Sequence, residues 1–97
     1  MTKLDIINKV SKGTGLSKIE TEAVFNGIIL SIETALMSGA RVDIRGFGNF
    51  ILKKRNARVA RNPLTQEEVD LPERYVPSFK VSKNLINNIN KSLKNNV

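Results

Sequence analysis

A run of apolar residues between Ile19 and Met37 places the strongest constraint on how this chain can fold. Ser17 with Glu20 three residues later is a capping signature that starts a helix, and Gly39 is suited to end it. The apolar side chains cover far more than the roughly 100° stripe that an ordinary surface helix buries. They are Ile19, Ala23, Val24, Phe25, Ile28, Ile29, Leu30, Ile32, Ala35, Leu36 and Met37. The predicted helix therefore needs packing partners on two faces.

A chain of 97 residues without cysteine has little material to cover both faces. A first helix over about residues 3–12, started by Thr2 and Asp5, can cover one of them. A second copy of the chain, or a sibling chain, is the natural candidate for the other. The alternative is a monomer with the apolar helix at its centre. The predicted dimer interface comprises Phe25, Ile28, Ile29, Ile32, Phe47, Phe50 and Phe79.

From Ala40 onward the apolar residues follow the period of two that is typical of strands. Val42 and Ile44 are predicted to face one side of a half-buried strand. The glycines of Gly46-Phe47-Gly48 accept positive φ, so this segment can turn the chain back into a partner strand over residues 49–55. The sequence thus changes from helix to antiparallel sheet near residue 40.

The last third of the chain is predicted to return to this sheet and end in a helix. Tyr75 and Phe79 resume the alternation, and Pro77 between them favours an edge strand. Ser82 is suited to cap a final helix over about residues 82–93, and we expect the Asn- and Lys-rich tail over 94–97 to fray. The expected class is α+β, with a helical body over about 1–39 and the sheet and its extension over about 40–81.

Positive charge is concentrated in one quarter of the chain. The net charge is +7, and residues 41–66 hold seven Lys and Arg residues against Asp43 alone, a local balance of +6. Residues 1–40 are balanced, with four cations and four acids, and residues 67–97 carry +1. A segment this cationic repels itself unless a polyanion lies against it. The pattern indicates a binding surface for nucleic acid.

The same segment lacks the apolar residues that would keep it on a core. Apolar alternation ends at Lys53, so the chain from there is predicted to project into solvent as a two-stranded arm over about 53–74. Asn62-Pro63 is a turn signal, and residues 67–71 can return antiparallel to the outgoing strand. The acidic residues of the return strand can partly offset the repulsion within the arm.

Other classes of function fit the sequence poorly. Without His or Cys, catalysis would depend on carboxylates, Lys or Ser, and the acidic residues of the arm have nothing to raise their pKa. No cofactor, metal site or small-molecule substrate is expected, and no apolar run approaches the ~20 residues that span a bilayer. Structured RNA or an acidic protein partner remains the alternative. RNA recognition favours exposed aromatic residues, and most of the five aromatics here are assigned to the core.

Several motifs at compatible spacing make the whole chain similar to one family. They are Gly46-Phe47-Gly48-Asn49-Phe50, Arg58, Arg61-Asn62-Pro63-Leu64-Thr65 and Val76-Pro77-Ser78-Phe79-Lys80 with Lys83 and Leu85. Together they resemble the bacterial HU and integration host factor family of DNA-bending proteins. Residues 43–48 and 74–77 look more like the beta subunit of integration host factor than like a typical HU.

The resemblance implies an intertwined dimer, homomeric or with a sibling subunit, that bends duplex DNA with two β-ribbon arms in the minor groove. Pro63 would wedge between base pairs at each arm tip. The remaining DNA contacts implied are Arg45, Lys53, Lys54, Arg55, Arg58, Arg61, Asn62, Lys3, Lys80 and Lys83. Such a protein would organise the bacterial nucleoid in the cytoplasm and assist recombination, replication or transcription complexes.

Three positions depart from the family pattern, which commonly has glycine at each. They are Ala60, Gln66 and Ser82. Gln66 lacks the tolerance of glycine for positive φ, so the tip turn is expected to be open to another geometry that would present Pro63 differently. Serine at position 82 can instead cap the last helix.

Overall fold

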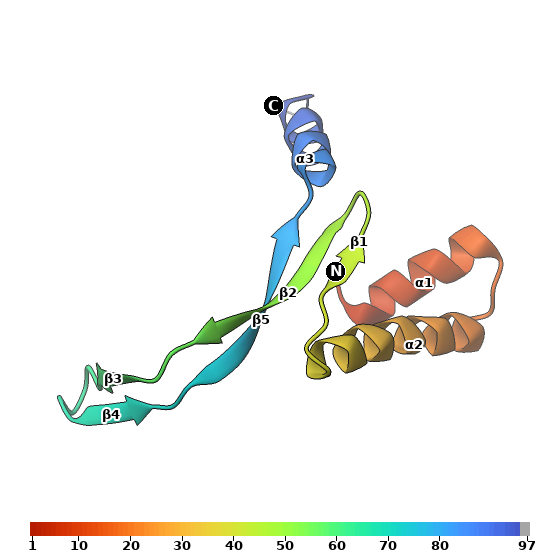
Figure 1. The fold of residues 1–97 in the computed structure, drawn as a ribbon. Helices are drawn as coiled ribbons and strands as arrows, with labels where there is room; N and C mark the ends of the chain where they lie inside the picture. Colours follow the sequence, from red (N-terminus) through yellow and green to blue (C-terminus); the bar gives the residue numbers. More distant parts are fainter. Residues whose placement is uncertain (96–97) are drawn as a thin grey trace.

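The computed structural model of the chain describes residues 1–95 and has the predicted α+β architecture (Figure 1). Two helices come first, five strands follow, and a third helix ends the described part. The elements are α1 (Lys3–Thr14), α2 (Lys18–Met37), β1 (Val42–Ile44), β2 (Gly48–Arg55), β3 (Arg58–Arg61), β4 (Glu68–Leu71), β5 (Arg74–Val81) and α3 (Lys83–Asn95). Helix α3 ends two residues beyond its predicted end. The tail over 94–97 was expected to fray, and its last two residues, 96–97, lie outside the described part.

Helix α1 begins at the predicted capping box. The Thr2 amide donates to Asp5 Oδ2 at 2.9 Å, and the Asp5 amide donates to Thr2 Oγ1 at 3.3 Å. The bond from the Thr2 amide, and after it the Thr2 side chain, hold the pKa of Asp5 below its usual value because both stabilise the carboxylate. The helix extends two residues beyond its predicted end, since Gly15 and not Gly13 adopts the left-handed conformation, with φ of 79°. The Gly15 amide then caps the helix by donating to the Ser11 carbonyl.

A single chain encloses almost no core. Ile7 on α1 and Thr21 on α2, each 4% exposed, are the two buried residues of the helical pair. By contrast Ile19 is 83% exposed and Ile28 55%, although both belong to the apolar helix. Helix α2 is therefore not enclosed at the centre of a monomer, and its apolar surface is open to a partner. No helix within residues 1–95 is both long and apolar enough to cross a bilayer.

The sheet has three antiparallel strands in the order β1-β2-β5. Phe50 on β2 lies directly opposite Phe79 on β5, with ring centroids 5.0 Å apart, and the Phe47 ring lies 5.2 Å from that of Phe79. Of the two glycines assigned to the β1–β2 turn, only Gly46 uses positive φ, at 83°. Gly48 is the first residue of β2 and is buried. Glycine is needed there because a Cβ would collide with β5.

The molecule is far more extended than a compact domain of its length. Its radius of gyration is 19.1 Å and its extents are 55 × 38 × 28 Å, whereas a compact chain of 100 residues has a radius of about 13 Å. Strands β3 and β4 form an arm that points away from the helices, and α3 follows the opposite end of β5 (Figure 1). Helix α3 leaves its apolar residues open, with Ile89 46% and Leu93 60% exposed. This shape leaves three apolar surfaces, on α2, the sheet and α3, for a partner to cover.

Candidate nucleic-acid interface

The arm is a separate two-stranded ladder. Antiparallel pairs run from Arg58 opposite Leu71 to Arg61 opposite Glu68, and the β2–β5 ladder ends at Arg55 opposite Arg74. Between the ladders, residues 56–57 on one side and 72–73 on the other belong to no strand. Residue 72 is proline, which has no amide hydrogen to give to a ladder. The ribbon predicted over 53–74 is therefore interrupted at its base.

Four residues, 63–66, form the arm tip, and Asn62 closes it. The Asn62 amide donates to the Glu67 carbonyl at 2.9 Å, and the Asn62 carbonyl accepts from the Gln66 amide at 2.8 Å. Its side-chain Oδ1 also accepts from the Leu64 amide at 2.9 Å, the arrangement by which asparagine favours turns. Asn62 thus fixes the loop from inside and leaves Pro63 exposed at its apex.

Gln66 adopts the left-handed conformation, which is unfavourable for a residue other than glycine. Its φ is 62°, and it is the one residue other than glycine within 1–95 that has positive φ. Its Nε2 donates to the Pro63 carbonyl at 3.5 Å. A left-handed conformation costs a residue with a Cβ roughly 1–2 kcal/mol, which the bonds at Asn62 help to offset. The tip keeps a glycine-like geometry at position 66.

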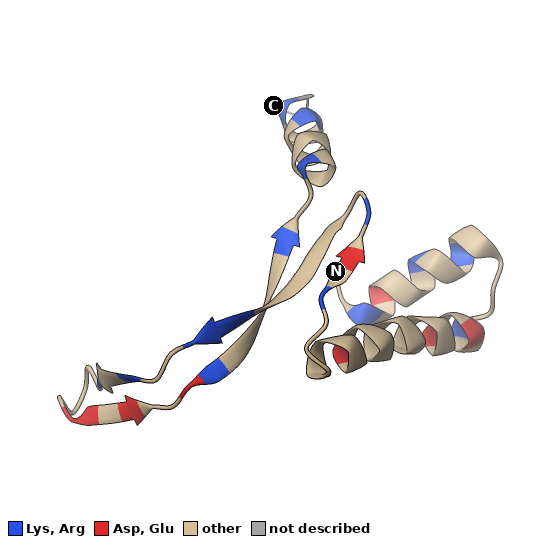
Figure 2. Cartoon of the chain, viewed as in Figure 1, with Lys and Arg blue, Asp and Glu red and all other residues tan. Residues whose placement is uncertain are grey.

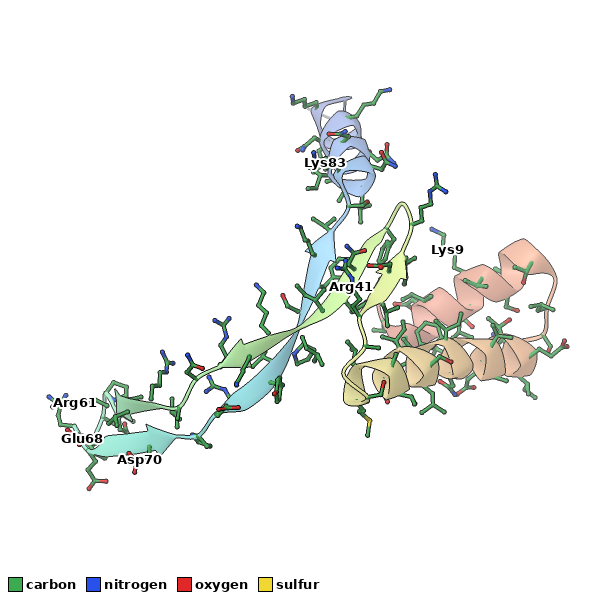
Figure 3. All side chains as sticks on the ribbon, in the orientation of Figure 1. Lys9, Arg41, Arg61, Glu68, Asp70 and Lys83 are labelled. Atoms are coloured by element: carbon green, nitrogen blue, oxygen red, sulfur yellow. The ribbon has the colours of Figure 1, made fainter. Side chains whose placement is uncertain are left out.

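Charge differs between the two strands of the arm. The outgoing side carries the predicted cations Lys53, Lys54, Arg55, Arg58 and Arg61, all exposed. The return strand β4 is acidic (Figure 2). Arg61 lies opposite Glu68 near the tip, with Asp70 farther along β4 (Figure 3). Near the base, Lys54 Nζ lies 3.2 Å from Glu73 Oε1. The ion pair across the arm is thus formed by Glu73 at its base, and not by the acidic residues of 67–71 from which the compensation of charge was predicted.

Three arginines surround a hollow where the ribbon is interrupted. The hollow has a volume of about 450 Å³ and is lined by Arg55, Asn56, Ala57, Arg58 and Arg74. Arg55 and Arg74 are direct cross-strand neighbours, a like-charged arrangement that is unfavourable unless an anion lies between them. The sequence analysis did not name Arg74 because this arginine lies outside the cationic segment 41–66. The predicted antiparallel return could have revealed it, since it places residue 74 opposite residue 55.

Arg45 lies exposed in the β1–β2 turn at the other end of the sheet. The acidic residue on β1, Asp43, pairs with Arg41 and not with Arg45: its Oδ1 lies 2.9 Å from an Nη atom of Arg41. Ser82 ties this turn to α3: its hydroxyl donates to the Gly46 carbonyl at 3.0 Å and accepts from the Leu85 amide at 3.1 Å. The serine cap predicted for α3 is therefore present, and it holds the start of that helix beside the turn.

The other predicted DNA contacts lie on separate elements. Lys80 is exposed on β5, and Lys83 is exposed at the start of α3 (Figure 3). Lys3 stands at the start of α1, with its Nζ 5.7 Å from the centroid of the Phe25 ring, within the range of a cation–π interaction. The structure thus gathers one group of cations on the arm and another around the sheet end near α3, while Lys3 lies on α1.

The residues predicted for the dimer interface occupy two surfaces. On α2, Ile28 and Ile29 are 55% and 41% exposed, and Phe25 and Ile32 are half-buried. On the sheet, Phe47 and Phe79 are 46% and 43% exposed, and Phe50 between them is half-buried. Large apolar side chains exposed to this degree in contiguous groups are typical of interaction surfaces.

Residues 1–90 match the profile of the family described as Bacterial DNA-binding protein. The chain belongs to this family. It is 41% identical to DNA-binding protein HU of Staphylococcus aureus (strain COL) over 85 residues, which are 88% of this chain and 94% of that protein. It is 42% identical to integration host factor subunit beta of Marinobacter nauticus over 95 residues, 97% of each chain. The two identities are too similar to separate the two branches of the family.

Solved structures agree with this assignment. The Anabaena HU–DNA cocrystal structure matches with a TM-score of 0.85 and 31% identity, covering 92% of this chain and 97% of that one. HU from Thermotoga maritima matches with a TM-score of 0.65 and 26% identity, covering 92% and 98%. Membership in the HU and integration host factor family confirms that the chain is a dimer-forming architectural DNA-binding protein and not an enzyme.

Proposed function

We propose that two copies of this chain, or one copy and a sibling subunit, enclose duplex DNA between their arms and bend it from the minor groove. Pro63 of each arm inserts between base pairs. The observation that carries this proposal is the exposed proline at the apex of a cationic arm that no part of the described chain covers. The wedge mechanism itself is supplied by the family resemblance.

Proline is suited to this role on chemical grounds. It is rigid and apolar, and it leaves no amide hydrogen unsatisfied when it stacks on a base. Unstacking a base step costs on the order of a few kcal/mol, and bending a short site costs roughly 1–6 kcal/mol. Contacts between phosphates and the cations on the arm, the β1–β2 turn and α3 would offset these costs. We therefore expect a long binding site on DNA that engages both groups of cations.

The hollow at the base of the arm adds a phosphate site to this proposal. Arg55, Arg58 and Arg74 present guanidinium groups that suit the bidentate recognition of phosphate. A backbone phosphate held there relieves the repulsion between Arg55 and Arg74. The arm is then anchored to DNA at its base as well as at its tip. In the cell, the protein would organise the nucleoid in the cytoplasm and assist recombination, replication or transcription complexes.

Pro63→Ala tests the wedge directly. Energy transfer between dyes at the two ends of a duplex should show a large loss of bending, with a smaller loss of affinity, because the arm cations remain. Pro77→Ala is the matched control: it also removes an exposed proline, but one on β5 in the sheet, and should retain the bend. Equal bending by Pro63→Ala and the unaltered protein would contradict the wedge. Competition by single-stranded DNA, double-stranded RNA and an acidic protein checks the alternative partners.

A further inference from the structure

The residue after Pro63 is an unusually exposed leucine. Leu64 is 93% exposed, more than Met37 at 88% or Ile19 at 83%. Its backbone amide is engaged with Asn62 Oδ1, so the turn holds the main chain of Leu64 in place while its side chain contacts nothing that buries it. A single exposed leucine on a surface is common. This one is contiguous with Pro63 at the apex of the arm, where the nearest strand residues, Arg61 and Glu68, are charged.

No surface within residues 1–95 covers Leu64. The apolar faces of α2, the sheet and α3 lie at the opposite end of the molecule from the arm tip (Figure 1). The flanking strand residues are Arg61 and Glu68, which are paired across the ladder and are polar. The partner that the arm binds is therefore the one available to remove this side chain from water.

We propose that Leu64 is a second base-contacting residue of the arm: it enters the minor groove beside Pro63 and packs on the base edges and sugars next to the wedged step. This inference rests on the proposed function. A leucine forms no ion pair with phosphate, so its contribution comes from burial of apolar surface. The tip thereby becomes a wedge of two apolar residues, and it favours flexible pyrimidine–purine steps, which open at lower cost.

Three substitutions separate this role from simple exposure. A duplex carrying 2-aminopurine beside the wedged step brightens when that base unstacks. Leu64→Ala should reduce the brightening and raise Kd about tenfold, the scale of losing most of a buried leucine side chain. Leu64→Met, which keeps an apolar side chain of similar volume, should behave like the unaltered protein. Leu64→Lys should keep its affinity at low salt through phosphate attraction while the brightening falls.

Pro63→Ala in the same assay distinguishes the two proposals. If Leu64→Ala and Leu64→Lys brighten the probe as the unaltered protein does while Pro63→Ala does not, Leu64 is only exposed and the inference is overturned. If Pro63→Ala also leaves the brightening and the bend unchanged, the wedge itself fails, and the role of Leu64 fails with it. Circular dichroism of each variant checks that the fold is retained, which is expected for a side chain that packs on nothing.

Discussion

Gly48 lies where the chain has no space for even one more carbon. A Cβ on this residue would lie 2.6 Å from the Lys80 carbonyl oxygen and 2.6 Å from Cζ of Phe79. The carbonyl belongs to the backbone of β5, so it cannot move without opening the sheet. The ring belongs to the aromatic group of the predicted dimer surface. One glycine therefore couples the sheet register to the packing of Phe79.

Gly48→Ala is accordingly expected to destabilise the protein by about 1–3 kcal/mol, the usual cost of overpacking. Thermal unfolding followed by circular dichroism measures this as a lower Tm. Gly13→Ala is the matched control, because a Cβ on Gly13 meets nothing within 4 Å and the residue lies within α1. Alanine there should leave Tm unchanged or raise it. Equal Tm values for Gly48→Ala and the unaltered protein would show that the β2–β5 contact is looser than described.

The capping box of α1 predicts a pH dependence. Hydrogen bonds to Thr2 hold the pKa of Asp5 below its unfolded value, so their stabilisation is present at neutral pH and is lost as pH falls through the folded pKa. Asp5→Ala should lower Tm at pH 7, and the difference from the unaltered protein should shrink below about pH 4. Thermal unfolding across this range measures it. A difference independent of pH would mean that the Asp5 carboxylate contributes nothing through its charge.

At the scale of elements, the arm has one cationic strand and one acidic strand. An acidic strand close to DNA lowers affinity, because its carboxylates repel phosphate. Arg61 and Glu68 are direct neighbours across the ladder, so side chains of opposite charge stand side by side near the tip. We therefore expect an orientation on DNA in which the outgoing strand, rather than β4, follows the phosphates.

Neutralising Glu68 and Asp70 together, as Glu68→Gln with Asp70→Asn, should raise affinity for DNA several-fold at low salt. The gain should shrink toward zero at high salt, because screening weakens exposed charges, while the affinity of both proteins falls by orders of magnitude. Fluorescence anisotropy at a series of salt concentrations measures both effects. Glu33→Gln, which neutralises an acidic residue on α2 away from the arm, serves as control and should change affinity little. Unchanged affinity in the double variant would place β4 away from the phosphates.

Most elements could be predicted because the signals that define them are local. The capping pairs at Thr2 and Ser17, and the change of period near residue 40, depend on neighbours in the chain. The interruption of the ribbon could not be predicted in this way. It arises where Pro72 meets residues 56–57 across the arm, and that meeting depends on strand register. Arg74 was missed for the same reason, since its cluster forms across two strands.

Backbone conformation at the tip was the other point that sequence left open. The preference of Gln66 is against positive φ, yet the hydrogen bonds at Asn62 impose it. A residue-by-residue preference cannot anticipate a loop that is closed by several bonds at once. The identity of the candidate DNA-contacting residues, in contrast, followed from the charge pattern and the resemblance, and their contacts with DNA stay predictions.

At the scale of the molecule, a thin core and an extended shape require a partner. Two buried residues in the helical pair cannot hold 97 residues together. Folding and dimerisation are then one reaction, so stability depends on protein concentration. The apolar surfaces of α2, the sheet and α3 would be buried together in that reaction.

We therefore expect Tm to rise with protein concentration, and the mass in solution to be about twice the 10.8 kDa of one chain. Thermal unfolding over a hundredfold concentration range and sedimentation equilibrium measure these. Ile28→Lys, at an exposed position of α2, should lower the folded fraction, whereas Glu22→Lys on the same helix should not. A Tm independent of concentration with a monomeric mass would contradict the requirement for a partner in folding.

The interruption at the base of the arm is also a joint, meaning a place where strands β3 and β4 can rotate relative to the sheet. No backbone pair of either ladder spans residues 56–57 and 72–73. The strand from there to Leu64 is roughly 20 Å long at the rise of an extended chain. A rotation of about 10° at the joint thus displaces the tip by roughly 3.5 Å, close to the ~3.4 Å rise between base pairs along one strand. If Pro63 is the wedge proposed above, a small change of angle at the joint would carry it from one base step to the next without altering the body of the dimer.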